Sequence, residues 1–383
     1  MDNLTTPQRG KQPQRIAVIG AGLGGVALAR MLHVQGLVAT VFDQDDDAHG
    51  RSVGGSLDMH EDSGLSAIRQ LGLFDKFQEV ARFEDQGMRL FDREGNLAFE
   101  MNDGQRPEID RGQLRELLVQ SIPADWFRWD HELAQVREAA GGGFELVFHN
   151  GQTEHADFVV GADGARSQVR PAVTDVRPHY SGLTFFELEI RNVDQDHPEV
   201  AHFISNGLHM AFGENKLISC QRNAAGNARL YASLFVPEDG LTKTGYATVK
   251  PRTKAELTEE FTGWGHSLVQ LFAAAGDAVR PWPIYTMPIG YRWSHRPGIT
   301  LLGDAAHVMP PAGEGANLAI RDGVDLACAL AAADPDQAVS AYEEVMFART
   351  RKAAAIASAV LLEGSSEDRL ALIKRAMSPQ EAV

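Results

Sequence analysis

Three stretches of the chain place glycine and aspartate where they suit a ligand that carries phosphates and a ribose. Gly20, Gly22 and Gly25 follow the spacing G-x-G-x-x-G, and Asp43 ends the next apolar run. In this spacing the first glycine permits a tight turn, the second lets the backbone approach a pyrophosphate, and the third allows close helix–strand packing. Because Asp43 can accept hydrogen bonds from ribose hydroxyls, the pattern predicts a site for FAD or NAD.

Two later aspartates favour FAD over NAD. Asp163 follows the apolar run 158–160 in a Gly-Ala-Asp-Gly stretch, and Asp304 follows the run 299–302 in a Gly-Asp-Ala-Ala-His stretch. Ligands of open α/β sheets bind beyond the carboxyl ends of the strands, so the glycine loop and both aspartates are expected to converge on one crevice. A ligand that reaches all three has to be long, which suits FAD.

The elements that must position these residues form a Rossmann-like unit. The run 16–19 is typical of a buried parallel strand, 26–35 of a helix that ends at Gly36, and 38–42 of a second strand. A further helix is expected from about 317 to 332, after the Asp304 stretch. These elements indicate an α/β fold in which the strands point toward one shared site.

Composition and charge restrict the partners. The chain has 383 residues, with 36 Lys and Arg against 52 Asp and Glu, a formal net charge of −16. Nucleic acid and anionic membranes both attract clustered basic residues, so this acidity disfavours them as partners. The two cysteines, Cys220 and Cys328, cannot form a disulfide framework, and no apolar run is long enough to span a bilayer. We therefore expect a monomeric cytoplasmic protein with a disordered tail at residues 1–14 and no metal site.

Taken together, the glycine loop and the two aspartate stretches resemble the motifs of the class A flavin monooxygenases of the aromatic-hydroxylase type. The stretches RSVGGSLDMH (51–60), EIDRGQLR (108–115) and DAAHVMPP (304–311) are similar to those of the TetX-type tetracycline-inactivating monooxygenases. This resemblance implies an FAD-dependent, NADPH-consuming enzyme that hydroxylates an aromatic, polyketide or tetracycline-like substrate with O2, through a C4a-hydroperoxyflavin. It also implies a link to antibiotic resistance. Two alternatives remain open: a flavin dehydrogenase or oxidase on the same fold, and a non-catalytic flavin-binding protein.

The resemblance also implies roles for individual residues. The glycine loop and Asp43 would hold the ADP half of FAD, Asp58 would approach the flavin end, and Asp304 would bind a ribityl hydroxyl. Arg51 matches a residue assigned to NADPH contact, and Arg111 would hydrogen-bond the cofactor. Asp58 could instead cap the helix expected over 61–70, and Arg111 could pair with Asp110 or Glu108. The complete expected cofactor set is Gly20, Gly22, Gly25, Asp43, Arg51, Asp58, Arg111, Asp163, Asp304, Gly315 and Asn317, with no protein side chain expected to carry out the chemistry itself.

One departure from the TetX-type pattern falls beside the flavin. The loop after Pro311 is one residue shorter, and Glu314 replaces the usual glutamine. A carboxylate here would oppose the negative charge of reduced flavin unless Glu314 points to solvent or pairs with an arginine. His307, in the Asp304 stretch, is interpreted as a structural hydrogen-bonding residue rather than a catalytic one.

A second domain is expected to supply the substrate platform. Strand patterns over 184–190, 208–212, 216–220 and 230–236, with hairpin turns at Asn206-Gly207 and 225–227, predict an antiparallel sheet. Glu187, His209, Arg222 and Tyr231 are the expected pocket residues if they share the face above the cofactor; a solvent-facing position is the alternative for each. Near these positions the tetracycline-handling enzymes carry Gln, Arg and His, whereas this chain has Glu187, Leu208 or His209, and Tyr231, which puts tetracycline specificity in doubt.

The expected organisation is a Rossmann-like FAD-binding domain with an inserted antiparallel-sheet substrate domain and a C-terminal helix. The FAD-binding domain covers 15–75, 102–175 and 286–336, and the substrate domain covers 76–101 and 176–285. Apolar residues at 3–4 spacing in 337–383 predict a helix that bridges the two domains.

Overall fold

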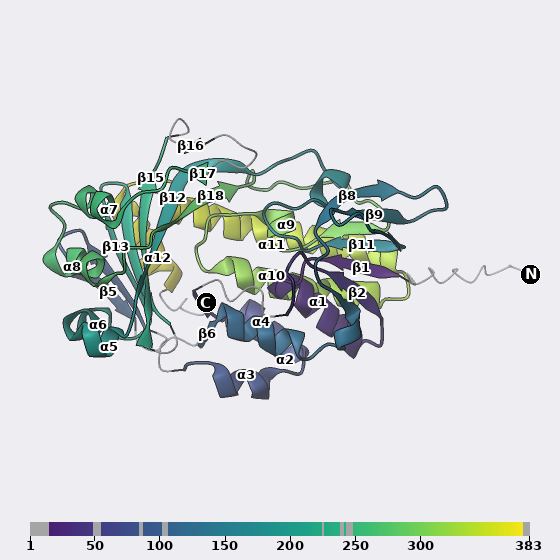
Figure 1. Cartoon of the computed structure of the whole chain (residues 1–383), viewed down its shortest axis with the longest axis horizontal. Helices are drawn as coiled ribbons and strands as arrows, with labels where there is room; N and C mark the ends of the chain where they lie inside the picture. The colour runs from purple at the N-terminus through teal and green to yellow at the C-terminus, as the bar shows by residue number, and fades with distance from the viewer. Residues whose placement is uncertain are drawn as a thin grey trace, which may run out of the picture.

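The computed structural model describes residues 15–48, 55–83, 87–101, 106–223, 226–237, 241–242 and 248–377. Figure 1 shows a parallel sheet with α1 and α10 at one end of the molecule and a larger sheet at the other, with α11 between them. Within the described part of the chain, every helix is too short or too polar to traverse a lipid bilayer. The same residues contain no cluster of three metal-ligating side chains.

The parallel sheet has the strand order β19-β11-β1-β2-β7, with the bounds Ile299–Leu301, Phe158–Gly161, Ile16–Ile19, Ala39–Phe42 and Phe127–Arg128. Its central strands are fully buried, which explains their continuous apolar runs. An antiparallel sheet of β8 (Leu133–Glu138), β9 (Phe144–Phe148) and β10 (Thr153–Ala156) packs on it, with the Phe42 and Phe148 rings 4.9 Å apart.

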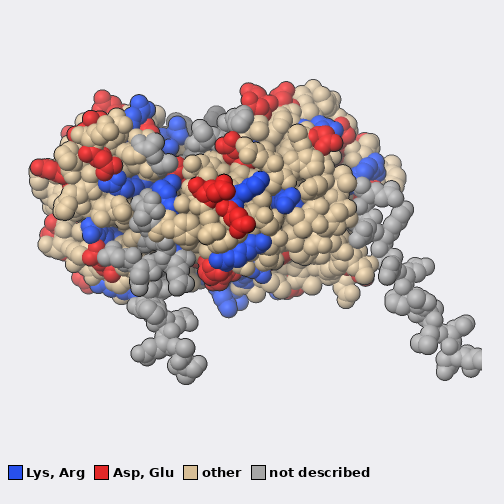
Figure 2. Space-filling model, turned by 90° about the horizontal axis from the view of Figure 1, so that it is seen from below, with Lys and Arg blue, Asp and Glu red and all other residues tan. Residues whose placement is uncertain are grey.

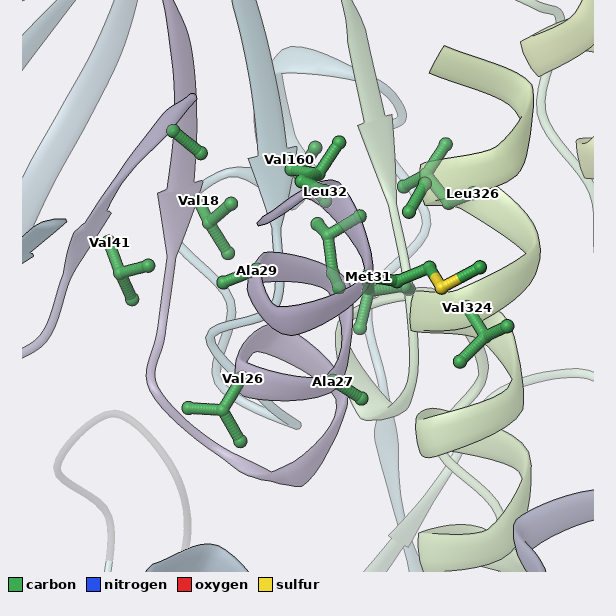
Figure 3. Packing of buried hydrophobic residues seen from close by; sticks show 14 of the residues in the cluster. Val18, Val26, Ala27, Ala29, Met31, Leu32, Val41, Val160, Val324 and Leu326 are labelled. Atoms are coloured by element: carbon green, nitrogen blue, oxygen red, sulfur yellow. The ribbon is translucent and has the colours of Figure 1, made fainter. Parts of the chain in front are cut away.

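Two helices pack beside the parallel sheet. They are α1 (Leu23–Val34) and α10 (Glu314–Leu330), and α10 begins three residues earlier than the sequence predicted. Figure 3 shows Met31 of α1 extending toward Val324 and Leu326 of α10, within the cluster that also contains Val18 and Val160 of the sheet. Burying these side chains between helices and strands fixes the start of both helices at the carboxyl edge of the sheet.

The larger sheet has seven strands in the order β18-β12-β15-β14-β13-β4-β5. Their bounds are Arg280–Thr286, His179–Ile190, Ala228–Phe235, Lys216–Arg222, Leu208–Gly213, Met88–Asp92 and Leu97–Met101. All neighbours are antiparallel except β13 and β4, which are parallel. The sheet thus combines strands from 76–101 and 176–285, the two ranges predicted to form the substrate domain.

Helices cover the outer face of this sheet. They are α5 (Val193–Asp196), α6 (Pro198–Ile204), α7 (Lys254–Glu260) and α8 (His266–Ala274), and their apolar residues form one cluster with Phe186, Leu188 and Ala232 of the strands. The opposite face, called the inner face below, turns toward β3 (Ser56–Asp58), because a Cβ placed on Gly55 would lie 3.2 Å from Tyr231 Oη.

The hairpin between β13 and β14 is closed by Glu214 and Asn215. Both have positive φ values, 49° and 60°, the combination that a type I′ turn requires. Asn206-Gly207, predicted to be a hairpin turn, instead connects α6 to β13, so that prediction was wrong. Gly207 has φ 94° and lies against the backbone of Gly87, where a Cβ would clash, so the close approach of β4 requires glycine there.

The C-terminal helix α11 (Pro335–Leu361) contacts both sheets. Tyr342, Met346 and Phe347 pack into the cluster of the parallel sheet, while Val360 and Leu361 pack into a cluster on the inner face, together with α12 (Ser366–Met377). The exact domain boundaries stay a prediction. One adjustment follows from packing: α3 (Phe74–Val80) buries Phe77 in the parallel-sheet cluster, although 76–101 was expected in the substrate domain.

The remaining elements join these layers. A two-stranded pairing joins β3 to β6 (Glu108–Asp110), which leads directly into α4 (Arg111–Val119). Between β3 and α3 lie a π-helical turn, Glu61–Leu65, and α2 (Ser66–Gln70), in place of the single helix expected over 61–70. The short helix α9 (Asp304–His307) follows β19, and β16 (Leu241–Thr242) pairs with β17 (Thr248–Val249).

Candidate functional site

The three motifs leave the parallel sheet side by side. The register aligns Ile19 with both Gly161 and Phe42, and Gly161 with Leu301. The glycine loop, Asp43, the Asp163 stretch and the Asp304 stretch therefore begin at one edge. This is the convergence that was expected from strands that each end in a motif.

The glycine loop is built for a ligand at Gly22 and for close packing at its two ends. A Cβ on Gly20, which has φ 108°, would lie 2.3 Å from Ala162 O, and a Cβ on Gly25 would lie 2.0 Å from Gly20 O. A Cβ on Gly22 would meet nothing within 4 Å. Gly22 is also the N-cap of α1 and supplies no side-chain cap, so the first N–H groups of the helix are available to an anion.

Asp43 and Arg115 hold the loop from both sides of one peptide. Asp43 Oδ2 accepts a hydrogen bond from Ala21 N at 2.5 Å, and Arg115 Nε donates to Ala21 O at 2.8 Å. Arg115, one turn after Arg111 on α4, is 7% exposed and also donates to Ala48 O and Asp45 Oδ2. Asp43, which was predicted to bind the ribose, thus also holds the glycine loop in place. Arg115 is a buried residue with the same effect, and the sequence reasoning missed it.

Asp163 combines a satisfied and an unsatisfied oxygen. Its Oδ2 accepts from Gln168 N at 2.7 Å and from Val169 N at 3.2 Å. Its Oδ1 is buried and has no hydrogen-bond partner among the residues that the structure describes. Burial raises the pKa of Asp163. A buried acceptor that lacks a donor is costly unless a ligand supplies one.

Arg170 connects the two aspartate stretches. Its guanidinium is 3% exposed and donates to Ala305 O at 2.8 Å, Asp304 O at 2.9 Å and Ala165 O at 2.9 Å. Arg170 thus contacts the backbone of Asp304 and not its carboxylate, which is exposed. The spacing of Arg170 from Asp163 was visible in the sequence, but only the structure gives it this connecting role.

Arg111 is the first residue of α4, and Asp304 and Tyr231 lie close enough to affect the pKa of its guanidinium. Its guanidinium has no hydrogen bond or ion pair to the part of the chain described, so neither Asp110 nor Glu108 is its partner. Burial lowers the pKa of Arg111, and Asp304 and Tyr231 counteract this effect. Asp110 and Glu108 pair instead with Arg82, at 2.9 Å and 3.6 Å.

Glu108 is a second residue that the sequence reasoning missed as part of the site. It is 3% exposed, accepts from Ser56 Oγ at 2.7 Å, and accepts from Gln221 Nε2 of the inner face at 3.1 Å. Burial raises the pKa of Glu108 to about 7, against these hydrogen bonds and the Arg82 charge. Glu108 therefore links β6 to the seven-stranded sheet through a carboxyl group that titrates near neutrality.

Asp58, His60 and Glu314 form a cluster at the first turn of α10. His60 Nε2 lies 2.8 Å from Asp58 Oδ2, and His60 Nδ1 lies 3.1 Å from Glu314 Oε1. Burial would raise the pKa of Asp58, but the hydrogen bond and charge of His60 together with Arg106 keep it below its usual value. Asp58 therefore contacts His60 and does not supply the N-cap of the turn that starts at Glu61, since that N-cap is His60.

Asn317 fixes this turn to β3. It is fully buried, donates to Asp58 O at 2.8 Å and accepts from His60 N at 2.9 Å. The Asn317 amide group therefore forms its hydrogen bonds with the backbone of residues 58 and 60. Gly315 lies two residues before Asn317, with no atom within 4 Å of a Cβ placed there. The open approach at Gly315 and the absence of a side-chain cap on α10 leave backbone N–H groups for a ligand.

His307 has the structural role that the sequence suggested. Its Nε2 lies 2.6 Å from Asp322 Oδ2, which also accepts from Gly303 N at 3.0 Å, while Arg349 of α11 donates to Asp322 Oδ1 at 2.7 Å. Asp322 is fully buried. This network ties α10 and α11 to the loop that carries Asp304.

Two of the four predicted substrate residues lie on the inner face. Glu187 and Tyr231 are directly paired across β12 and β15. Glu187 Oε2 accepts from Trp282 Nε1 at 2.8 Å and its Oε1 pairs with Arg229. Burial and the Glu187 charge raise the pKa of Tyr231 to about 12. Phe185, whose ring centroid is 6.2 Å from that of Tyr231, adds a further aromatic residue to this surface.

The other two predicted substrate residues lie on the outer face, so their expected pocket position is corrected. His209 is 3% exposed and stacks on Phe91, with ring centroids 5.8 Å apart. Arg222 pairs with Asp194 of α5 at 2.8 Å and donates to the backbone of α6. The physical reason is strand alternation: neighbouring side chains point to opposite faces, and these two share the parity of Cys220 and Ala211 in the helix-covered cluster. Arg51, the predicted NADPH contact, falls outside the described residues.

The residues present fit FAD. Several groups lie along the edge of one sheet or on elements that join it: the open space at Gly22, the starts of α1 and α10 without a side-chain cap, Asp163 Oδ1 and the guanidinium of Arg111. The last two have no hydrogen-bond partner among the residues that the structure describes. A long ligand with phosphates near α1 would satisfy these groups together.

A family model described as the FAD binding domain matches residues 14–360. The chain belongs to this family. It is 29% identical over 413 residues to the monooxygenase asqM of Emericella nidulans, covering 88% of this chain and 93% of that protein. It is 28% identical over 334 residues to 6-hydroxynicotinate 3-monooxygenase of Pseudomonas fluorescens, covering 82% of each. This FAD-binding family member is therefore a flavoprotein monooxygenase, an oxidoreductase that hydroxylates a small organic substrate.

Solved structures agree with this fold. The tetracycline destructase Tet(55) superimposes with a TM-score of 0.71 and 24% sequence identity, over 97% of this chain and 98% of that one. The expected likeness to class A flavin monooxygenases of the tetracycline-inactivating kind is thus confirmed, and so is the α/β fold with FAD as cofactor.

Proposed function

We propose that this monooxygenase takes electrons from NADPH and uses O2 to hydroxylate a small organic substrate, aromatic, polyketide or tetracycline-like, between the inner face and the first turn of α10. The observation that carries the proposal is the aromatic surface of Phe185, Tyr231 and Trp282 on the inner face, next to β3 and Arg111. Trp282 is 40% exposed, which is unusual for tryptophan and provides a flat apolar contact. A relative that acts on 6-hydroxynicotinate and a structural neighbour that acts on tetracyclines support a ring-shaped substrate.

The proposed cofactor contacts follow the geometry of the site. Gly22 and the first N–H groups of α1 bind the pyrophosphate, and Asp43 and Asp163 accept hydrogen bonds from the cofactor. Asp304 binds the ribityl chain, and Arg111 and the first turn of α10, including Gly315, hold the flavin end. When bound, FAD supplies the electron transfer from nicotinamide and the activation of O2.

The protein's own residues position the substrate and exclude water. Glu187 orients Trp282 and Arg229 by accepting a hydrogen bond from each, which fixes two side chains of the inner face. Tyr231 keeps its proton at neutral pH, as any tyrosine with a pKa of 10 or above does, and its hydroxyl can donate a hydrogen bond to an acceptor on the substrate. A Cβ at position 55 would lie 3.2 Å from Tyr231 Oη, so glycine there leaves room for the Tyr231 hydroxyl beside β3.

The chain is further proposed to act as a monomer in the cytoplasm. Cys220 is buried and Cys328 is exposed, and both are free, which suits a reducing compartment. Figure 2 shows acidic and basic side chains interspersed on the lower face, so the net negative charge is not gathered there into one field. A dianionic pyrophosphate can therefore be bound through local backbone N–H groups despite the overall charge.

The test is a panel of phenols, polyketides and tetracyclines, screened for stimulated oxidation of NADPH or NADH, with product masses measured under ¹⁸O2. The expected result is preferential use of NADPH and a product that gains one labelled oxygen. Reduction of FAD without oxygen insertion would instead identify a dehydrogenase or oxidase, and protein that cannot be loaded with FAD would refute the proposal.

Matched variants test the position of the substrate. Trp282→Leu on the inner face is expected to raise KM severalfold, because it removes the aromatic contact. His209→Leu on the outer face is the control, since both ring nitrogens of His209 are buried without a hydrogen-bond partner among the described residues. Equal effects of the two substitutions on KM would contradict the placement of the substrate on the inner face.

A further inference from the structure

His60 lies between two carboxylates that come from distant parts of the chain. Asp58 Oδ2 lies 2.8 Å from its Nε2 and Glu314 Oε1 lies 3.1 Å from its Nδ1. Both neighbours accept hydrogen bonds, so both ring nitrogens have to donate. A neutral imidazole has only one N–H, and the geometry therefore requires the positively charged form.

The charged groups around His60 favour that form on balance. Burial alone would lower the pKa of His60, which is 5% exposed, and Arg106 Nη1 at 3.4 Å from Nε2 also opposes its charge. The hydrogen bonds and charges of Asp58 and Glu314 outweigh burial and raise the pKa of His60 to about 9. The imidazolium is thus the form present at neutral pH.

Glu314 stands where a negative charge has the largest effect on the field of α10. It is the first residue of this 17-residue helix, and Gly313 before it supplies no side-chain cap. The amino end of a helix carries a partial positive charge of about half a unit, so a bare carboxylate there would cancel the positive field. His60 supplies the opposite charge, and Asn317 holds the same turn against the backbone of His60.

We infer that His60 and Glu314 are positioning residues that form a charge-compensated pair, which keeps the first turn of α10 electrically favourable for anionic reduced flavin. The pair also explains how this chain accommodates glutamate beside the flavin: among the described residues, the carboxylate of Glu314 pairs with His60, two residues after the end of β3, rather than with an arginine. This inference depends on the proposed placement of the flavin end at the first turn of α10.

Charge counting gives opposite signs for the single variants. Glu314→Gln removes one negative charge, so it is expected to raise the preference for reduced over oxidised FAD roughly tenfold, for a unit charge acting over several ångströms in protein. His60→Gln removes one positive charge and is expected to lower this preference by a similar factor. The double variant restores the balance and should lie within about threefold of the wild type. A tenfold change corresponds to about 30 mV for a two-electron couple.

Two measurements test the inference. The first is an NMR titration of the His60 ring in protein without FAD, assigned by comparison with His60→Gln, where the wild type is expected to titrate well above 6.5 and Glu314→Gln at lower pH than the wild type. The second is the midpoint potential of bound FAD in the wild type, the two single variants and the double variant. The control is His155→Gln, which removes an exposed histidine of β10 and should leave the potential unchanged.

Each outcome decides a separate point. A His60 titration at an ordinary histidine pKa would refute the charged pair itself. Equal potentials in Glu314→Gln and the wild type would refute the effect on the flavin, whether or not His60→Gln folds. Neither measurement uses substrate, so an absence of hydroxylation would contradict the proposed function while leaving this inference intact.

Discussion

Alanine substitution at two glycines of the same loop is expected to give two different defects. In Gly25→Ala, the new Cβ would lie 2.0 Å from Gly20 O and 3.2 Å from Ala162 Cβ, in the packed contact between α1 and the sheet. In Gly22→Ala, the new Cβ meets nothing within 4 Å, and the backbone of Gly22, at φ −72° and ψ 175°, suits alanine. Gly25→Ala is therefore expected to lower the stability of the fold. Gly22→Ala is expected to fill only space that a ligand would occupy.

The magnitudes follow from these distances. A carbon that lies more than 1 Å too close to an oxygen forces movement in a packed region, which costs about 3 kcal/mol at the upper end of the usual range for overpacking. The better helix propensity of alanine returns about 1 kcal/mol, leaving Gly25→Ala destabilised by about 2 kcal/mol. Gly22→Ala loses a glycine N-cap but restricts the unfolded chain, so the two effects nearly cancel and its stability changes by less than about 1 kcal/mol.

The expected effect of Gly22→Ala is on the cofactor. A methyl group at this position would push a phosphate oxygen away from the N–H groups of α1, and losing one hydrogen bond to a charged group costs about 1.5–3 kcal/mol. FAD affinity should therefore fall roughly 10–100-fold. The assay is urea unfolding of protein stripped of FAD, combined with titration of FAD by its fluorescence quenching.

Two results would refute this reasoning. If Gly22→Ala without FAD is destabilised as much as Gly25→Ala, the space beside Gly22 is not open in the folded protein. If Gly22→Ala binds FAD as tightly as the wild type, the cofactor does not approach the backbone at this residue.

Three further predictions concern single charged residues. Arg111→Met should weaken FAD binding about tenfold or more, with the unfolding free energy without FAD changed by less than about 1 kcal/mol, because no protein group described here pairs with its guanidinium; unchanged FAD affinity would contradict this. Asp322→Asn should lower the free energy of unfolding in urea by about 3–5 kcal/mol, since it leaves His307 without its buried counter-charge and leaves Arg349 with Asp325 alone. Asp325→Asn on the same helix, 23% exposed, should cost less than about 1 kcal/mol, because Arg349 keeps the buried Asp322. The pKa of Glu108 in the folded protein is raised to about 7, so its contribution to stability is present below about pH 4.5 and is lost as the pH rises through 7. Between pH 4.5 and 8 the free energy of unfolding of the wild type should fall by about 3 kcal/mol relative to that of Glu108→Gln. Parallel pH profiles of the two proteins would disprove this.

The cofactor motifs could be located from the sequence because each directly follows a buried strand. Once the strands before Gly20 and Asp163 are parallel neighbours, their motifs have to leave the sheet at one edge, as the pairing of Ile19 with Gly161 shows. No knowledge of side-chain packing is needed for this inference. Arg115 could not be predicted in this way, because its contact with Ala21 depends on how α4 crosses the loop.

The faces of the seven-stranded sheet could not be assigned in this way. Both faces are apolar: Leu183 and Leu217 are buried on the inner face, and Phe186 and Ile218 on the outer face. Alternation tells that His209 and Cys220 share a side, but it does not tell which side the helices cover. The helices α5 to α8 come from segments between and after the strands, and their docking decides the question.

The partner of Glu314 could not be predicted from the sequence, because the start of α10 was not predicted correctly. The helix was expected from about 317, which would leave Glu314 in a loop with two alternatives, solvent or an arginine. Gly313 adopts φ 94°, which turns the chain so that α10 starts at Glu314 itself. Only this early start brings the carboxylate to His60, a contact between residues far apart in the chain.

The helix α10 connects these separate features into one mechanical unit. Its first turn is bound to β3 through Asn317, its middle holds Gly303 through Asp322, and the same carboxylate accepts from Arg349 of α11. Because α11 ends in the cluster on the inner face, packed and hydrogen-bonded elements connect the seven-stranded sheet to the Asp304 loop and to the turn that carries the His60–Glu314 pair. The charge pair therefore lies at the end of a continuous series of packed and hydrogen-bonded elements that begins at the seven-stranded sheet.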